Sequence, residues 1–546
     1  MNSHILLATE PNAGEPAAEE LLRSLIAGFP LPDLLRDLAT TGAMVAQLYD
    51  RGEYGIEGQL DILNRTCRGL ENADELIDKL RKGVYTAITD ENQIANLAMY
   101  AIRNRAYAGL ARSGSLIRTF ALFNKLCLQD PATGKYYVDP DSLQGAFSVA
   151  TTFRERANNI AYRYRRFIEW SDQHPDADKV RETFRAAKGM DYEQYAEAAV
   201  YLEEYFWKDF NVAGVRSLPE VAIDDPVVRE FLRRHSQTPE GIDEFLAGDQ
   251  MQTLRDQGFH RVMEFPFLLM NGEYFLLHPR AIENALGAGV FYAALPPGGH
   301  QDYFALVGQF FQEYIGEILE HVARSGGYTY SGEFKYARSA DGQRVDSNDH
   351  FLFRDGALFF FEARYARIPK NLLATLDPGE IEEALGTRIF SKFKQLNDNI
   401  TAYLAGDFEL PGVDRAKVRA IYPIVVLPHA FPRGPAVQDR FDKEIADKGY
   451  LQGVHGSIDV RPFEIAEAEA LEGFAGLANS PGLADVLERK FADRKNRFDF
   501  FKNQLVLKEG LQLRIWSDED MRAWYREVQR RRRERLEQSA AAGASV

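Results

Sequence analysis

The chain has 546 residues, in which 81 Asp and Glu residues outnumber 65 Lys and Arg residues, for a formal net charge of −16. It is too long for one hydrophobic core, since single cores stop growing near about 250–300 residues. The two cysteines, Cys67 and Cys127, exclude a disulfide scaffold and a cysteine-rich zinc site, and they favour a reducing compartment. The acidic balance excludes a histone-like coating protein, so nucleic acid would bind at local basic patches or in a metal-bridged cleft.

The sequence contains no apolar stretch near the roughly 18 residues that a membrane span needs. Its first residues lack the basic and apolar regions of a signal peptide. We therefore expect a cytoplasmic protein with no membrane partner.

In chain order, the patterning predicts an α+β multidomain protein with three regions. Residues 1–255 have mainly helical apolar spacing, as expected of a sensing or assembly region. Residues 256–432 begin with a hairpin around Asn271-Gly272 and end at the Pro/Gly-rich segment after Phe431. Residues 433–546 alternate short strands with helices and end in a basic helix that begins after a Ser517 cap, followed by a frayed tail from Ser539.

The most informative segment is residues 349–365, where two apolar runs flank Asp355-Gly356. Asp-Gly between apolar runs favours a two-residue β-turn, which fixes the pairing of the two strands. Counted outward from that turn, Asp349 lies directly opposite Glu362. Period-two alternation adds Arg364 to the same face.

Two carboxylates that meet at a buried strand end repel each other and lose their hydration. A divalent cation between Asp349 and Glu362 would offset both costs, because hard cations prefer carboxylate oxygens. An ion pair with Arg364 at a solvent-facing hairpin end is the alternative. The sequence therefore predicts either a divalent-cation site here or a structural ion pair.

The flanking segments have the periodicity of two helices and a strand. Residues 304–322 carry an apolar stripe at helical spacing, with Glu313 beside it. Residues 377–380 (Asp-Pro-Gly-Glu) are a typical helix start. The helix that they begin carries a polar stripe of Arg388, Lys392, Gln395 and Asn399. Residues 418–427 predict an apolar strand, although Pro423 argues against a fully central place in a sheet.

This order of helix, three strands, helix and strand resembles the PD-(D/E)XK nuclease superfamily, also called restriction-endonuclease-like, over residues 300–431. Asp349 matches the metal-binding Asp, and Glu362-Ala-Arg364 matches the Glu-x-Lys motif. Glu313 lies in a segment similar to the first-helix motif, and Gln395 resembles a helix Gln found in several branches. The resemblance implies an αβββαβ core in which Asp349 and Glu362, with Glu313 as a further candidate, hold one or two Mg²⁺ ions that act on a phosphodiester.

Position 364 departs from the family pattern, because Arg stands where the family has Lys. Arg stabilises charge on a phosphate but does not act as a general base, since its pKa lies above about 12. Three interpretations stay open: Arg364 suffices because water activation is metal-driven, Lys392 or Lys394 from the next helix takes the place of the lysine, or the site has lost catalysis.

Two arginine-rich segments are candidates for contact with a phosphate backbone. Residues 153–166 interleave arginine with tyrosine on a predicted helix, and the candidates there are Arg154, Arg163, Arg165 and Arg166. The basic run near the C-terminus supplies Arg530, Arg531 and Arg532. For both segments the alternative is an ordinary solvated helix face.

The expected function is metal-dependent hydrolysis of nucleic-acid phosphodiester bonds, with DNA favoured by analogy. A large helical region attached to such a core resembles bacterial anti-phage or restriction effectors. The alternative is a catalytically inactive scaffold that keeps the fold and binds nucleic acid or a partner protein. A homo-oligomer or a companion subunit is compatible with either. The sequence contains no His-x-x-x-His pair, no Gly-x-Ser-x-Gly elbow and no dinucleotide fingerprint, so it does not support serine-hydrolase or nicotinamide chemistry.

Overall fold

The chain folds into two compact units, named here unit 1 and unit 2. Unit 1 comprises Met1–Asp139, Thr151–Gly299 and Glu519–Val546, and unit 2 comprises Pro140–Ala150 and His300–Asp518. The computed structural model describes residues 18–51, 91–110, 116–128, 143–144, 157–175, 177–207, 215–286, 301–337, 342–366, 372, 377–428, 431–432, 434–451, 458–475, 482–492 and 518–543. The described part contains no helix that is long and apolar enough to cross a lipid bilayer.

These units differ from the three regions predicted from the sequence. The hairpin after residue 256 belongs to unit 1, because its strands pair with strands from earlier in that unit. Most of residues 433–518 belong to unit 2, because their strands extend its sheet. The terminal helix returns to unit 1, so unit 2 is an insertion within unit 1 along the chain.

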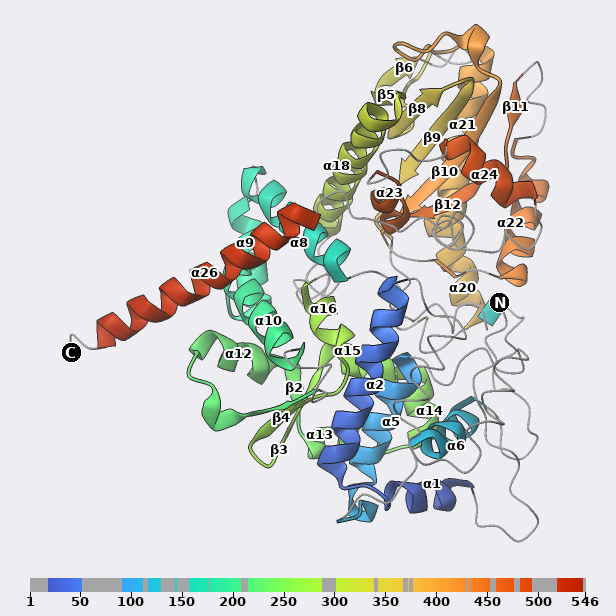
Figure 1. Ribbon diagram of the computed structural model, residues 1–546. Coiled ribbons are helices and arrows are strands. Elements are labelled where there is room, and N and C mark those ends of the chain that lie inside the picture. The colour runs from blue at the N-terminus through green and yellow to red at the C-terminus, as the bar shows by residue number, and fades with distance from the viewer. Residues whose placement is uncertain are drawn as a thin grey trace. The chain divides into compact units, whose positions relative to one another are not determined.

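Unit 1 is mainly helical around one small sheet (Figure 1). Its longer helices are α1 (Ala18–Ile26), α2 (Leu31–Arg51), α5 (Glu91–Arg103), α6 (Leu116–Leu128), α8 (Ala157–Gln173), α9 (Ala177–Lys188), α10 (Tyr192–Trp207), α12 (Pro226–His235) and α26 (Asp518–Gly543). Shorter helices are α13 (Pro239–Phe245), α14 (Gln250–Thr253), α15 (Phe259–Glu264) and α16 (Arg280–Leu286). The sheet has the order β1-β4-β3-β2, with β1 (Ser217–Pro219), β2 (Ser236–Gln237), β3 (Phe267–Met270) and β4 (Glu273–Leu276).

Two sequence predictions for unit 1 are tested directly. The Asn271-Gly272 hairpin is confirmed, since both residues have positive φ and join β3 to β4. The expected fraying after Ser539 is wrong, because α26 continues to Gly543. Alanines at 540–542 favour this continuation, as Ala has the highest intrinsic helix propensity. Ser517 lies outside the described residues.

Unit 2 is built on a six-stranded mixed sheet with the order β11-β10-β9-β8-β5 and with β12 also beside β10 (Figure 1). The strands are β5 (Thr329–Gly332), β8 (His350–Arg354), β9 (Ala357–Ala363), β10 (Ala420–Leu427), β11 (Asp459–Val460) and β12 (Glu464–Glu467). β5, β8 and β9 are antiparallel to one another, whereas β9, β10 and β12 run parallel. A small hairpin of β6 (Lys335–Ala337) and β7 (Arg344–Asp346) lies between β5 and β8 in the chain.

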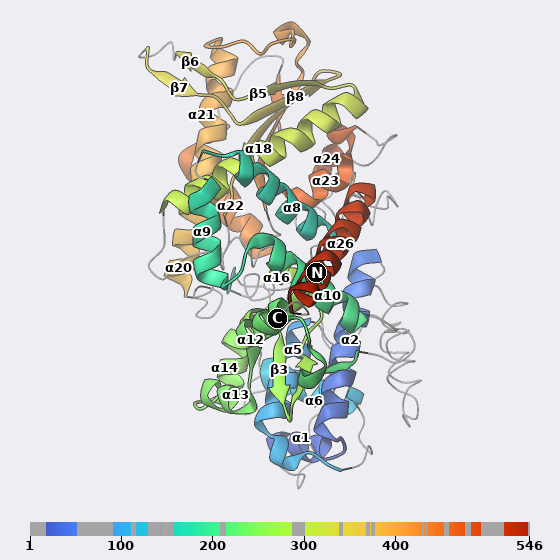
Figure 2. The same cartoon turned by 90° about the vertical axis from the view of Figure 1, so that its left-hand side faces the viewer.

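Helices cover both faces of this sheet, as Figure 2 shows for α18 and α21. On one face, α18 (Gln301–Gly326) packs against β5 and β8. On the other, α20 (Pro378–Leu385), the π-helical turn Gly386–Phe390 and α21 (Ser391–Ala405) form the main core. The remaining helices are α22 (Pro435–Lys448), α23 (Ala468–Ala475) and α24 (Leu483–Ala492). The α+β class is therefore confirmed, and α20 begins as predicted with Asp377 accepting a hydrogen bond from the backbone N–H of Glu380 at 3.0 Å.

The turn between β8 and β9 is the two-residue loop predicted from Asp355-Gly356. Both residues have positive φ, 51° for Asp355 and 87° for Gly356, as a type I′ turn requires. The pairing that follows places His350 opposite Phe361 at the far end of the hairpin. The predicted register is confirmed.

β10 lies in the interior of the sheet, so the argument from Pro423 against a fully central place is wrong. The carbonyls of Arg419 and Ile421 accept hydrogen bonds from β11 and the residue after it, so odd-numbered residues of β10 face that side. The neighbours there are β11 beside residues 420–421 and β12 beside residues 424–427. Pro423 faces the gap between them, where no ladder hydrogen bond needs its missing N–H.

Gly316 of α18 lets this helix approach the sheet at His350. A Cβ at Gly316 would lie 2.9 Å from His350 Cε1 and 3.2 Å from the Tyr330 hydroxyl. His350 cannot yield easily, because its ring nitrogens bond to the Tyr330 hydroxyl at 3.0 Å and to the Gln312 carbonyl at 2.9 Å. We expect Gly316→Ala to lower the free energy of unfolding by about 1–3 kcal/mol, measured by urea denaturation.

Gly308 provides the matched control for that substitution. It lies on the same helix, and an added Cβ would meet nothing within 4 Å. Gly308→Ala should therefore raise stability by up to about 1 kcal/mol through helix propensity. Equal effects of the two substitutions would contradict the close approach at His350.

Candidate active site

The candidate site lies where β8 begins and β9 ends. Asp349 directly precedes β8, and Glu362 is the last residue but one of β9. One further step of the observed register sets these two residues opposite each other, on the face that α21 covers. Asp349 is 6% exposed and Glu362 is fully buried, so both carboxylates have lost nearly all contact with water.

Each carboxylate is held by specific donors. Asp349 Oδ2 accepts a hydrogen bond from the backbone N–H of Ala363 at 2.7 Å, which caps the end of β9. Glu362 Oε1 accepts from Asn348 Nδ2 at 2.5 Å, and Oε2 accepts from Lys392 Nζ at 2.7 Å. Lys392, from the first turn of α21, is thus the one basic side chain that bonds to either acid among the described residues.

These surroundings leave the pair short of positive charge. Burial raises the pKa of Asp349 to about 6, with Lys392 and the Ala363 N–H opposing the rise and Glu333 adding to it. Burial and then the charge of Asp349 raise the pKa of Glu362 to about 8, although Lys392 and Asn348 oppose this. One lysine does not compensate two buried carboxylates. A second positive charge is needed before both can ionise at neutral pH.

The structure brings together three of the predicted site residues, Glu362, Lys392 and Gln395. Lys392 Nζ donates to Gln395 Oε1 at 2.8 Å as well as to Glu362, so Gln395 orients the lysine. Of the two lysines that the sequence offered as substitutes for the family lysine, Lys392 is the one that bonds to Glu362. Lys394 does not, since it is exposed and pairs with Asp398 at 2.6 Å.

Two predicted residues lie outside this cluster. Arg364 is exposed, and its backbone N–H donates to the Val426 carbonyl just beyond the end of β9. Glu313 is exposed on α18 and accepts a hydrogen bond from Gln309 at 3.0 Å. No group of three or more His, Cys, Asp or Glu side chains placed to hold a metal occurs in the described ranges, so Glu313 does not complete a three-acid site.

Sequence reasoning missed two residues of the site. Asn348 donates to Glu362, and Glu333 acts on Asp349 through its charge. Asn348 lies in the short irregular segment between β7 and β8, where strand alternation does not apply. Its position directly before Asp349 was the one available signal. Glu333 follows β5, and only the pairing of β5 with β8 brings it near.

The donor set fits a small divalent cation. Asp349 and Glu362 offer hard carboxylate oxygens, both are buried, and Lys392 is the one basic side chain that bonds to either among the described residues. Mg²⁺ is usually held by one or two carboxylates and completes its shell with waters and phosphate oxygens. Two acids are therefore enough for a magnesium site that leaves positions for substrate.

The predicted nucleic-acid arginines in and before α8 are mostly engaged within the chain. Arg154 lies outside the described residues. Arg163 is buried. Arg165 and Arg166 both pair with Glu169, at 2.7 and 2.6 Å. These contacts favour a structural use of the segment, and nucleic-acid binding there stays a prediction.

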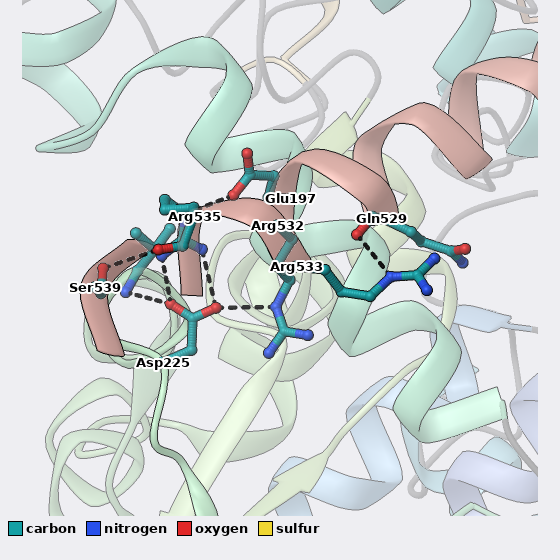
Figure 3. Close-up of polar contacts among 8 residues, drawn as sticks. Glu197, Asp225, Gln529, Arg532, Arg533, Arg535 and Ser539 are labelled. Atoms are coloured by element: carbon teal, nitrogen blue, oxygen red, sulfur yellow. Dashed lines mark hydrogen bonds and ion pairs between the residues drawn. The ribbon is translucent and has the colours of Figure 1, made fainter. Parts of the chain in front are cut away.

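The C-terminal arginines divide into two groups on α26. Arg530 and Arg531 are exposed and pair with Glu527 of their own helix at 2.6 and 2.8 Å. Arg532 instead pairs with buried Asp225 at the start of α12, at 2.9 Å (Figure 3). Only the first group faces solvent as a nucleic-acid contact would require.

Arg535 completes the docking of α26. It pairs with Asp225 at 2.9 Å and with Glu197 of α10 at 2.8 Å (Figure 3). Burial opposes ionisation of Asp225, but Arg535 and Arg532 more than offset it and hold the pKa of Asp225 below its usual value. The guanidinium of Arg532 also lies 3.8 Å from the ring centroid of Tyr201. Buried Asp225 is here paired with two arginines.

No family model matches the chain, and neither a curated protein nor a solved structure matches it. A function therefore has to be inferred from the geometry and charge of the site.

We expect the acid pair to make stability depend on pH in divalent-free buffer. Folding raises both pKa values, so the folded state keeps protons that the unfolded chain has released. The stabilisation is full below about pH 4 and is lost as pH rises toward about 8. In the wild type, the free energy of unfolding should fall by on the order of 1–4 kcal/mol between pH 5 and 8.5, measured by urea denaturation at each pH. Glu362→Gln should remove this fall.

Glu313→Gln is the control for this measurement, because Glu313 is exposed on α18. Its pH profile should follow that of the wild type. A Glu362→Gln profile that runs parallel to the wild type would show that the acids titrate normally and would contradict the charge deficit.

The docking of α26 gives a separate prediction. Arg535→Ala leaves Asp225 and Glu197 with less compensation, so it should lower the free energy of unfolding of unit 1 by about 1–3 kcal/mol. Arg533→Ala is the control, since Arg533 is exposed and bonds only to the Gln529 carbonyl among the contacts shown in Figure 3. The stability of both variants is measured by thermal or urea unfolding. Equal effects would contradict the conclusion that Arg535 holds α26 in place.

Proposed function

We propose that this chain is a cytoplasmic, metal-dependent nuclease that hydrolyses phosphodiester bonds, with DNA as the favoured substrate and Mg²⁺ or Mn²⁺ as the cofactor. The single observation that carries the proposal is that Asp349 and Glu362 are both buried, with Lys392 the one basic side chain that bonds to either among the described residues. Two buried carboxylates with one lysine between them form a costly arrangement that a divalent cation would stabilise.

The arrangement of elements supports the resemblance noted in the sequence. α18, β5, β8, β9, α21 and β10 follow one another in the order helix, three antiparallel strands, helix and parallel strand, with a small hairpin and α20 as additions. The acids lie at the end of the central strands. A fold likeness alone would not carry a function, so the proposal depends on the site.

Each side chain has a role in this proposal. A cation held by Asp349 and Glu362 would supply positive charge to a phosphate oxygen and lower the pKa of a bound water. Lys392 fixes the Glu362 carboxylate and brings an ammonium group to the place where charge develops on the phosphate. Gln395 holds Lys392 in that position. Arg364, exposed at the strand end, is placed to contact the substrate backbone.

The alternative is a catalytically inactive scaffold that binds nucleic acid or a partner protein. One observation favours it, namely that the raised pKa of Glu362 allows a proton to supply the missing charge. A Glu362 carboxyl that stays protonated needs no cation. The two proposals therefore differ in what neutralises the pair, and divalent dependence separates them.

The test is cleavage of supercoiled plasmid, linear duplex and single-stranded DNA by the full chain, with Mg²⁺, with Mn²⁺ or with EDTA. We expect cleavage with either metal and none with EDTA. Asp349→Asn and Glu362→Gln should each lower the cleavage rate at least about 100-fold, and Lys392→Ala should lower it about 100- to 1,000-fold.

Lys394→Ala is the matched control, because Lys394 lies two residues away on the same helix and pairs with exposed Asp398. It should cleave like the wild type. DNA binding without cleavage in the wild type and in both acid variants would support the scaffold. Cleavage that survives Glu362→Gln would place the chemistry elsewhere in the chain.

A further inference from the structure

Among the described residues, Asn348 is the one fully buried polar side chain that touches the acid pair and keeps an unused oxygen. It has no exposed surface, and its Nδ2 donates to Glu362 Oε1 at 2.5 Å. Its Oδ1 is also buried and has no hydrogen-bond partner within the part of the chain that the structure describes. Buried acceptors are rarely left unpaired, because each has given up its hydrogen bonds to water.

The backbone around Asn348 holds this amide in place. The N–H of Ser347 donates to the Phe334 carbonyl at 2.8 Å, and the N–H of Phe334 donates to Ser347 Oγ at 3.0 Å. Ser347 Oγ in turn donates to the Asn348 carbonyl at 2.9 Å. These contacts hold the backbone on either side of the amide, and a rotation that turned Oδ1 away would also break the bond from Nδ2 to Glu362.

The orientation of the amide leaves only its oxygen available to a ligand. Because Nδ2 is occupied by Glu362, Oδ1 is a hard, neutral oxygen beside two carboxylates. Amide carbonyls are ordinary ligands of small divalent cations. A neutral third ligand also suits this pair, since a third carboxylate would add to the repulsion that Asp349 and Glu362 already experience.

We propose that Asn348 is a third oxygen ligand for the divalent cation of this site, with Nδ2 holding Glu362 and Oδ1 facing the ion. This inference rests on the proposed function, because it needs a cation between Asp349 and Glu362. It assigns to Asn348 a binding role in this chain that goes beyond the aligned motif residues.

The test measures cation binding rather than cleavage. Mg²⁺, and Ca²⁺ as a second probe, are titrated into the full chain by calorimetry, and the cation-dependent rise in Tm is recorded in parallel. Asn348→Ala should weaken binding about 10- to 100-fold and reduce the rise in Tm. Asn348→Asp, which keeps an oxygen at this position, should bind within about 10-fold of the wild type while having a lower Tm without cation.

Asn399→Ala is the matched control, since Asn399 is a buried asparagine of the same unit that accepts a hydrogen bond from the Tyr336 hydroxyl. It should leave cation affinity unchanged. A wild type that binds no cation overturns the proposed function and this inference together. A wild type that binds, with Asn348→Ala binding equally well or Asn348→Asp losing binding, overturns the inference alone.

Discussion

The pairing of β8 with β9 is the constraint on which the rest of the site depends. Asp355 and Gly356 both adopt positive φ, and this two-residue turn fixes which residues of the hairpin face each other. Side chains alternate between faces, so a shift of one residue would move Glu362 away from α21 and away from Lys392. The turn lies at one end of the hairpin and the acids at the other. The turn therefore fixes, through the strand register, that Asp349 and Glu362 lie opposite each other.

Buried carboxylates receive different amounts of positive charge at two places in this chain. At the start of α12, buried Asp225 receives two arginines from α26, and its pKa is lowered. At the end of β9, buried Glu362 shares one lysine with a neighbouring acid, and its pKa is raised. A compensated acid stabilises the fold, whereas an undercompensated pair is stabilised by whatever brings positive charge. We therefore propose a function for the second cluster only, whereas the first holds α26 against α10 and α12.

The sequence predicted those parts of the structure that depend on short-range rules. Turn chemistry at Asp355-Gly356 determined the register, and the Asp377 cap determined where α20 begins. It left open which lysine of α21 reaches Glu362, because that depends on how α21 packs against β9, a contact between residues 30 positions apart in the chain. Asn348 was missed because it lies in the irregular segment between β7 and β8, where no strand periodicity assigns a side chain to a face. The partners of α26 were missed because Asp225 lies 307 residues before Arg532, a separation that no local pattern encodes.

The most direct test of the central claim is to locate a bound ion. Crystals of the full chain soaked in Mn²⁺ should give an anomalous scattering peak within coordination distance of carboxylate oxygens of both Asp349 and Glu362, with Lys392 still on Glu362. A well-ordered acid pair with no peak between the carboxylates, or a peak bound elsewhere while the pair shares a proton, would contradict the account.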